Sequence, residues 1–415
     1  MFTTHNKYLN KRKIINDPVY GFINFQSNLI FDIVEHPWFQ RLRRIKQLGL
    51  TELVYPGAKH SRFHHALGAM HLMQLAIESL MSKGIKITEQ EKEGAFLAIL
   101  LHDIGHGPFS HSLEHNIINA THEDLSKIFI QKLNIQFNGA LDTAYKIFIG
   151  TYPKNFLHQL VSSQLDVDRL DYLRRDSFFT GVTEGVVSSD RIIKMLDVDN
   201  DKLVVEKKGI YSIEKFLIAR RLMYWQVYLH KTVHSVEQML LSILKRAKFL
   251  AKNNIDLFAT PAFKYFLYND IDLNSFNKKD NNVLDTFALL DDNDLISSIK
   301  VWTSHKDKIL SMLCSRFINR NLFKNIIQDT PFDNDLIEDI KKKTAKKLNI
   351  SISDIDFFVK SDTIKNSAYS QDTDKILIKE KNNTITEIVN VADMVNIKAL
   401  SGTVSKYYLC YPKDI

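Results

Sequence analysis

LLHDIGHGPFSH, at Leu100–His111, decides how this chain folds and where its chemistry lies. Its dipeptide His102-Asp103 follows an apolar run, Ala95–Leu101, which predicts a buried helix. A buried helix that ends on an imidazole beside a carboxylate needs a partner for the charge, because burial of an unpaired carboxylate is very costly. We therefore expect this pair to bind a metal ion or to be ion-paired.

The neighbouring segments also favour helices. Thr88–Glu91 matches the S/T-x-x-E capping box, which predicts the start of the helix that leads into His102. Apolar residues between Leu67 and Leu80 recur with a period near 3.6, which predicts an earlier amphipathic helix.

Candidate partners for His102-Asp103 lie on both sides of it in the sequence. Upstream, His64 and His65 begin the amphipathic helix, and the spacing alone does not choose between them. Downstream, SSQLDVDRLDYLRRDS places Asp168, Tyr172 and Asp176 at i, i+4 and i+8, on one helix face, with Asp171 beside them. Two imidazoles and two carboxylates suit Fe, Mn, Zn or Ni, and carboxylates also accept Mg. Four protein ligands in an octahedral site leave positions for water and a substrate oxygen, as catalysis requires.

The chain divides near residue 335. Residues from about 31 to 330 are mostly helical in pattern, with a short inserted β-hairpin predicted at 202–211. Beyond that point a lysine-rich helix at 341–347 is followed by predicted strands at 357–359, 376–378 and 407–411, with Asn382-Asn383 as a turn. We predict a mainly α protein with an all-helical core at 1–335 and a smaller α+β lobe at 336–415, packed on the core and at a subunit interface.

The composition excludes several classes of protein. Hydrophobic residues make up 45% and charged residues 25% of the 415 residues, as in an ordinary globular protein, and two cysteines, Cys314 and Cys410, argue against a disulfide framework. The beginning, MFTTHNKYLNKRK, has no apolar signal segment, and no stretch approaches the ~18 apolar residues of a membrane span. We expect a cytoplasmic protein that does not enter a membrane. The net charge of +7 fits either a lysine-rich solvated surface or attraction to polyanions.

Taken together, the motifs resemble the HD-domain metal-dependent phosphohydrolases. The resemblance is closest to the deoxynucleoside triphosphate triphosphohydrolases, the branch of the sterile-alpha-motif-and-HD-domain protein and its bacterial relatives. It rests on seven stretches: KIINDPVYG (13–21), HPWFQRLRRIKQLG (36–49), YPGAKHSRFHHALG (55–68), HDIGHGPFSH (102–111), HED (122–124), LDVDRLDYLRRD (165–176) and YLHKTV (228–233).

The resemblance assigns roles to individual residues. It implies the metal ligands His65, His102, Asp103 and Asp168, because the family pattern R-F-x-H makes His65 the ligand and leaves His64 at the variable position. The implied triphosphate contacts are Arg62, His106, His111, His122, Arg169 and Arg220, and arginine suits phosphate because its guanidinium binds two oxygens at once. The implied sugar contacts are Gln47, Leu48, Tyr172 and Asp176, with Tyr228 as a further substrate residue. Gln47 and Asp176 would hold the 3′-hydroxyl, and Tyr172 would crowd the 2′ position.

Hydrolysis at the α-phosphorus needs a water nucleophile, neutralised charge and an acid for the 5′-oxygen. Histidine suits proton donation because its pKa lies near neutrality. We favour His111 as the acid, oriented by Glu114, and the alternative is His122 with Glu123. His106 is a further catalytic candidate.

The eukaryotic branch also binds nucleotides between subunits, as activators. Six positions match that second site: Lys13, Asn16, Glu35, Gln40, Arg43 and Lys231. Glu35 stands where that branch has aspartate, and Leu229 replaces a glutamine near the substrate sugar. The resemblance thus implies a dNTP or GTP activator and a homo-oligomer, either dimer or tetramer.

The leading hypothesis is a dGTPase-like dNTP triphosphohydrolase that depends on a divalent metal and releases deoxynucleoside and inorganic triphosphate. One alternative is an HD phosphohydrolase or phosphodiesterase that acts on another nucleotide. Another is a non-catalytic nucleotide sensor or nucleic-acid binder, suggested by the lysine-rich segment at 341–347. Nucleic acid is the less favoured partner, because a pure binder would not need the full ligand set.

Overall fold

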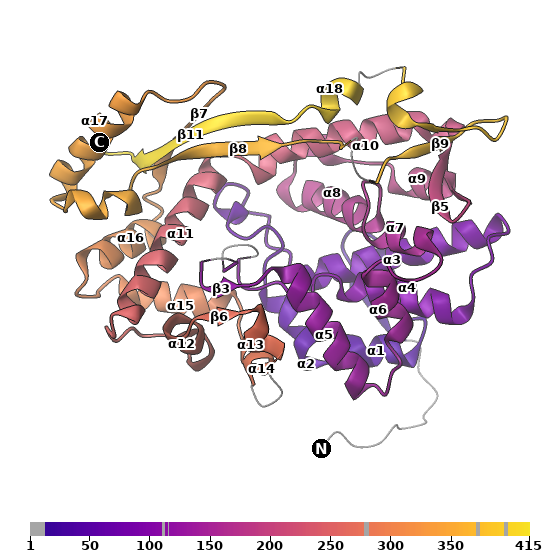
Figure 1. Ribbon diagram of the computed structural model, residues 1–415, viewed down its shortest axis with the longest axis horizontal. Coiled ribbons are helices and arrows are strands. Elements are labelled where there is room, and N and C mark those ends of the chain that lie inside the picture. Colours follow the sequence, from indigo (N-terminus) through magenta and orange to yellow (C-terminus); the bar gives the residue numbers. More distant parts are fainter. Residues whose placement is uncertain (1–12, 110–112, 115, 278–281, 371–373, 394–396) are drawn as a thin grey trace.

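The protein is mainly α-helical, as predicted (Figure 1). The computed structural model describes residues 13–109, 113–114, 116–277, 282–370, 374–393 and 397–415. The helices are α1 (Asn28–Glu35), α2 (Pro37–Gln40), α3 (Arg62–Ser82), α4 (Glu89–Leu101), α5 (His122–Gln136), α6 (Asp142–Phe148), α7 (Asn155–Val161), α8 (Val167–Thr180), α9 (Ser189–Met195), α10 (Ile210–Met223), α11 (Lys231–Lys252), α12 (Pro261–Tyr268), α13 (Leu273–Asn277), α14 (Val283–Phe287), α15 (Asp292–Trp302), α16 (Lys308–Ile318), α17 (Asn334–Leu348) and α18 (Ile397–Ser401).

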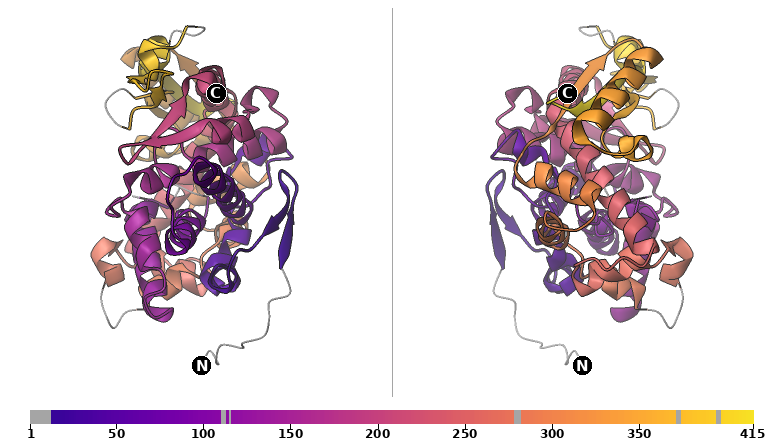
Figure 2. Two further views of the ribbon diagram at one scale, coloured as in Figure 1. Left: turned by 90° about the vertical axis from the view of Figure 1, so that its right-hand side faces the viewer. Right: turned by 90° about the vertical axis from the view of Figure 1, so that its left-hand side faces the viewer.

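The strands form small sheets around the helices. They are β1 (Ile14–Asp17), β2 (Gly21–Asn24), β3 (Ile118–Asn119), β4 (Leu196–Asp199), β5 (Lys202–Glu206), β6 (Ile271–Asp272), β7 (Phe323–Gln328), β8 (Lys360–Asn366), β9 (Leu377–Lys379), β10 (Ile385–Glu387) and β11 (Val404–Pro412). Their orders are β1-β2, β10-β9-β5-β4, β7-β11-β8 and β3-β6. The hairpin β1–β2 lies at the edge of the molecule in Figure 2 and is absent from the elements predicted above.

The centre of the core is formed by α3 and α4, which pack against each other. The apolar run of α4, Ala95–Leu101, is buried on every side, as expected for a helix without a polar face. The predicted capping box is confirmed: Thr88 Oγ1 accepts from the Glu91 amide, and Glu91 Oε2 accepts from the Thr88 amide. After α4 the chain passes tightly against α5, since a Cβ at Gly105 would lie 2.2 Å from the His122 carbonyl oxygen. Glycine at this position lets the loop carry Asp103 and His106 close to α5.

The inserted hairpin exists, but its predicted turn was wrong. Strand β5 pairs with the preceding strand β4, and the turn is Asn200-Asp201, where both residues have positive φ. Such a turn matches the twist of the two strands, and Asn and Asp tolerate this conformation. Ile210 and Tyr211, predicted within the hairpin, instead begin α10.

The C-terminal segment adds strands to both ends of the helical core. Strands β8 and β11 lie above α10 and α11 in Figure 1, and β9 pairs in parallel with β5. The turn at Asn382-Asn383 is confirmed between β9 and β10, whereas the strand predicted at 357–359 begins only at Lys360. Strand β7, which precedes the predicted boundary at 335, pairs with β11, and the division into two domains stays a prediction.

Among the described residues, no helix combines the length and the apolar character needed to cross a membrane.

Candidate active site

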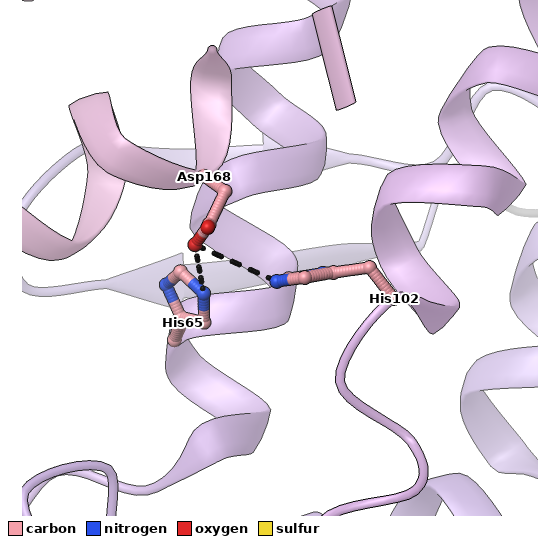
Figure 3. Close-up of side chains that lie close together, drawn as sticks. All are labelled: His65, His102 and Asp168. Atoms are coloured by element: carbon pink, nitrogen blue, oxygen red, sulfur yellow. Dashed lines mark ion pairs between the residues drawn. The ribbon is translucent and has the colours of Figure 1, made fainter. Parts of the chain in front are cut away.

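Three side chains from three helices converge beside the end of α4 (Figure 3). His65 lies in the first turn of α3, His102 caps the end of α4, and Asp168 lies in the first turn of α8. Oδ1 of Asp168 is 3.0 Å from Nε2 of His65 and 3.5 Å from Nε2 of His102. Two imidazole nitrogens and a carboxylate oxygen so close together can hold a divalent metal ion.

The two imidazole rings are fixed with Nε2 toward the shared point. Nδ1 of His65 donates to Oδ2 of Asp171 at 2.7 Å, and Nδ1 of His102 donates to the Ile99 carbonyl at 2.6 Å. With the proton on Nδ1, Nε2 keeps its lone pair, which is the usual arrangement of metal-bound histidine. Both Nε2 atoms are buried, and within the described chain neither has a hydrogen-bond partner of good geometry. These orphaned acceptors fit a divalent metal ion.

The charges around this point favour a cation. Burial alone would lower the pKa of His65, but the carboxylates of Asp168 and Asp171 raise it to about 10. Burial opposes ionisation of Asp168, yet His102 and His65 hold the pKa of this carboxyl far below its usual range. The carboxylates therefore stabilise a positive charge, which either a proton or a metal ion can carry.

Asp103 lies between this group and a second cluster of histidines. Its Oδ1 atom is 3.3 Å from Nε2 of His102 and 3.3 Å from Nε2 of His106. Its Oδ2 atom is 3.9 Å from Nε2 of His65 and forms an ion pair with Arg62. The structure thus brings all four expected ligands together, with Asp103 shared between the metal group and Arg62.

The expected catalytic histidines lie next to Asp103. The rings of His106 and His122 stack at 3.9 Å between centroids, and Nδ1 of His122 donates to Oε1 of Glu114 at 3.0 Å. Burial and the nearby Arg62 guanidinium hold the pKa of His106 well below its usual range, so this ring is neutral. The expected pairing of His122 with Glu123 is wrong, because Glu123 follows it directly on α5 and is exposed. His111, the favoured acid, lies outside the described residues.

Two of the expected phosphate-binding arginines carry unused donors. Arg169 forms an ion pair with Asp166, and among the described residues its buried Nε atom has no hydrogen-bond partner. The same holds for the buried Nε and Nη1 atoms of Arg220. Burial raises the pKa of Tyr172, and the nearby Arg220 and Arg169 oppose that rise. Both guanidinium groups therefore border Tyr172 and can donate to an anionic ligand.

The expected sugar contacts meet at Asp176, which is buried. Its Oδ2 atom accepts from the Tyr228 hydroxyl at 2.8 Å, and its Oδ1 atom lies 2.7 Å from Nε2 of His60. Gln47 is linked to the same region, because its backbone amide donates to the His60 carbonyl. Its buried side-chain Oε1 has no hydrogen-bond partner within the described segments. His60 is the residue that the sequence reasoning missed, since its position in HSRFHH gives no local sign of a contact with α8. Leu48 is half-buried against the core.

The structure gives individual surroundings for the six residues matched to a second nucleotide site. Gln40 Oε1 accepts from Arg43 Nε at 2.7 Å, and Arg43 lies over the Phe63 ring. Lys13 lies over the Phe31 ring, while Asn16 and Glu35 are exposed. Lys231 instead lines a separate cavity of about 800 Å³.

Comparison with known proteins places the chain in a family. Residues 62–175 match the HD domain, and residues 187–260 match the HD associated region. A solved phosphohydrolase from Bacteroides thetaiotaomicron is 54% identical, with a TM-score of 0.93 and coverage of 97% of this chain and 100% of that one. YwfO of Bacillus subtilis is 35% identical over 77% of this chain and 73% of its own length. The human deoxynucleoside triphosphate triphosphohydrolase SAMHD1 is 27% identical over 78% of this chain and 56% of its own length.

The matched HD domain contains all four expected metal ligands, His65, His102, Asp103 and Asp168, and it ends at Arg175 of α8. The HD associated region covers α10, which supplies Arg220, and the segment at 224–228 between α10 and α11, which supplies Tyr228. The chain therefore belongs to the HD-domain family, in the group with an HD-associated region that includes the SAMHD1 triphosphohydrolases.

Proposed function

We propose that this protein is a metal-dependent dNTP triphosphohydrolase that converts a deoxynucleoside triphosphate to deoxynucleoside and inorganic triphosphate. One observation carries the proposal. Nε2 of His65 and Nε2 of His102 are buried without a partner among the described residues, and both lie beside Asp168 of α8. The next residue on that helix, Arg169, has a buried Nε atom that also lacks a partner in the described chain. A cation site beside a buried arginine donor suits a polyphosphate substrate.

His65, His102 and Asp168 would hold the divalent ion, with Asp103 as the fourth ligand. When bound, such an ion supplies a Lewis acid for the α-phosphoryl oxygen and lowers the pKa of a coordinated water. Asp171 and the Ile99 carbonyl hold the two rings with Nε2 inward, so the ligands are oriented before the metal arrives. The nature of the ion, whether Fe, Mn, Zn, Ni or Mg, is open.

The chain's own groups would bind the triphosphate and supply the proton. Arg62, Arg169 and Arg220 would neutralise the charge of the triphosphate and fix its position. As water adds to the α-phosphorus, the bond to the 5′-oxygen breaks and that oxygen takes a proton. His106 is a poor donor because it is neutral, whereas the hydrogen bond to Glu114 holds the His122 ring in place. This contact supports His122 as the acid, with His111 as the rival.

The sugar would lie between α8 and the segment at 224–228. Asp176 keeps lone pairs for the 3′-hydroxyl after bonding His60 and Tyr228, and Gln47 offers the unpaired Oε1. The Tyr172 ring, which lies edge-to-face with Tyr228 at 6.0 Å between centroids, would exclude a 2′-hydroxyl. We therefore propose a preference for deoxyribose.

The test is a panel of dNTPs and NTPs on protein of known metal content, with products identified by mass spectrometry. The proposal expects deoxynucleoside and triphosphate from the wild type, no turnover from Asp168→Ala, and unchanged turnover from Glu123→Gln, whose exposed carboxylate serves as a matched control. Release of nucleoside monophosphate and pyrophosphate would contradict the reaction. Comparable turnover of ribonucleotides or cyclic nucleotides would favour the phosphodiesterase alternative, and binding without turnover would favour a nucleotide sensor.

We also propose that an activating nucleotide binds near Lys231, in a homo-oligomer. The cavity of about 800 Å³ there is basic, with Lys231, Lys324, Lys406, Lys413 and His230 on its walls. Nζ of Lys406 lies 4.8 Å from the ring of Trp225, which can stack on a base. With dATP as substrate, Lys231→Ala should abolish stimulation by added dGTP or GTP, whereas the exposed Lys342→Ala should not. Stimulation that survives in Lys231→Ala would exclude this cavity.

A further inference from the structure

The N-terminal hairpin is joined to the metal ligand His65 by a chain of buried ionic contacts. Oδ2 of Asp17, at the end of β1, lies 2.8 Å from Nη1 of Arg175. Nε of Arg175 donates to Oδ2 of Asp171 at 2.9 Å, and Nη2 donates to Oδ1 of Asp171 at 3.1 Å. Oδ2 of Asp171 in turn accepts from Nδ1 of His65 at 2.7 Å. Four side chains from three segments thus form one continuous series.

Each member of this series is withdrawn from water. The side chains of Arg175, Asp171 and His65 are 0% exposed, and that of Asp17 is 2% exposed. Buried charges rely on one another, because loss of one partner leaves an uncompensated charge in the interior. The planar guanidinium of Arg175 donates hydrogen bonds to the carboxylates of both Asp17 and Asp171. These bonds fix the rotation of the carboxylates as well as their position. The orientation of Asp171 therefore depends on Arg175, and that of Arg175 depends on Asp17.

Helix α3 is shaped to admit this series. Gly68 lies one turn after His65, and a Cβ there would lie 2.1 Å from Nη2 of Arg175 and 2.1 Å from Oδ1 of Asp171. Alanine favours a helix more than glycine does, so glycine here is explained by the space that the ion pair occupies. Any side chain at this position would displace Asp171 relative to His65.

The hairpin contacts the core through its turn as well as through Asp17, because the Arg175 guanidinium also lies over the Tyr20 ring. Of the strand residues of β1 and β2, only Asp17 and Ile23 are buried. Oδ1 of Asp17 also accepts from the amides of Val19 and Tyr20, so the same carboxylate shapes the turn and binds Arg175. Docking of the hairpin and placement of Arg175 are therefore coupled.

We propose that Asp17, Arg175 and Asp171 are positioning residues that set metal affinity, so that docking of the N-terminal hairpin controls the ligand His65. The inference rests on the proposed metal centre. Asp171 and Arg175 lie on α8 with the ligand Asp168. Asp17 comes more than 150 residues earlier in the sequence, and Arg175 links it to the proposed metal centre. Contacts that orient metal-bound histidines typically change metal affinity by 10–100-fold when lost.

The experiment measures metal affinity directly, by competition of Co²⁺ or Mn²⁺ against a chelator, in four variants of the full chain. Asp17→Asn removes the charge but keeps an oxygen for the Val19 and Tyr20 amides. Gly68→Ala places a Cβ on α3 in the space that Asp171 and Arg175 occupy. The matched control is Asp190→Asn, which removes an exposed carboxylate 3.7 Å from the neighbouring Arg174. Asp168→Ala removes a ligand and reports on the metal centre itself.

We expect Asp17→Asn and Gly68→Ala to weaken metal binding at least fivefold and to change the visible spectrum of bound Co²⁺, with Asp190→Asn unchanged. Circular dichroism and thermal unfolding of each variant establish that it is folded, and the Co²⁺ spectrum reports ligand geometry separately from folding. Loss of less than fivefold in Asp17→Asn, together with loss of metal in Asp168→Ala, would overturn the positioning role. Full metal binding by Asp168→Ala would instead overturn the metal centre. If Asp17→Asn does not fold, Gly68→Ala takes its place, and a loss of metal affinity below fivefold in that variant would overturn the positioning role.

Discussion

Nδ1 of His122 donates to Oε1 of Glu114 at 3.0 Å, across a loop that follows the metal ligands. The contact fixes the His122 ring beside His106 and holds a carboxylate oxygen against its Nδ1. A histidine held in this way is suited to protonate a leaving alkoxide.

The first prediction concerns that proton. His122→Ala should lower kcat by about 10²–10⁴-fold, the range for loss of a general acid, while metal content stays at one ion per chain. Glu114→Gln should give a smaller loss, because the amide oxygen can still accept from Nδ1 of His122 but is a weaker, uncharged partner. Glu123→Gln is the control and should match the wild type. Full activity in His122→Ala would leave His111 as the acid.

The second prediction concerns the metal and stability. An ion that binds only the folded chain stabilises it by about 2.7 kcal/mol when its concentration is 100 times its Kd. Adding the metal to chelator-treated wild type should therefore raise the free energy of unfolding in urea by about that amount. Asp168→Ala should show no such rise. An equal rise in this variant would show that the ion binds elsewhere.

Local signals in the sequence predicted the helices that carry the ligands. The Thr88–Glu91 capping box and the apolar run before His102 involve residues that are close together in the sequence. A short stretch of sequence is therefore enough to predict them. The strand β8 gave no such signal, since KSDTIKN is mostly polar and only partly buried on the sheet edge. The hairpin predicted at 202–211 begins one strand too late, because the strand before Asn200-Asp201, Leu196–Asp199, was not included in it.

The groups that orient the site could not be predicted in this way. The contact of His60 with Asp176 joins residues 116 apart, and that of Arg175 with Asp17 joins residues 158 apart. Such pairs depend on how α3, α8 and the hairpin pack, and neither residue type nor spacing records that packing. Asp171 was visible on the helix beside Asp168, yet its role follows only from its bond to His65.

The third prediction concerns acid stability and His234, which lies on α11 against the C-terminal sheet. Burial lowers the pKa of His234 from 6.5 to about 4, and its Nδ1 lies 3.1 Å from Nδ2 of Asn325. The neutral ring contributes stability that is complete above pH 6.5 and is lost as the pH falls toward 4. The difference of 2.5 pKa units corresponds to about 3 kcal/mol. The unfolding free energy of His234→Gln, measured in urea at pH 7 and pH 4.5 with chelator present, should therefore fall less than that of the wild type. Equal falls would contradict this assignment.

The fourth prediction concerns selection of the sugar. Tyr172 is half-buried beside Arg169 and Arg220, and its ring lies edge-to-face with Tyr228. Tyr172→Ala should open space at the 2′ position, so the ratio of kcat/KM for dNTPs to that for NTPs should fall about tenfold, the effect of relieving one steric contact. Tyr228→Phe is the matched control: it keeps the ring but removes the hydrogen bond to Asp176, so KM should rise for both sugar classes while their ratio stays constant. A constant ratio in Tyr172→Ala would show that a different group reads the 2′ position.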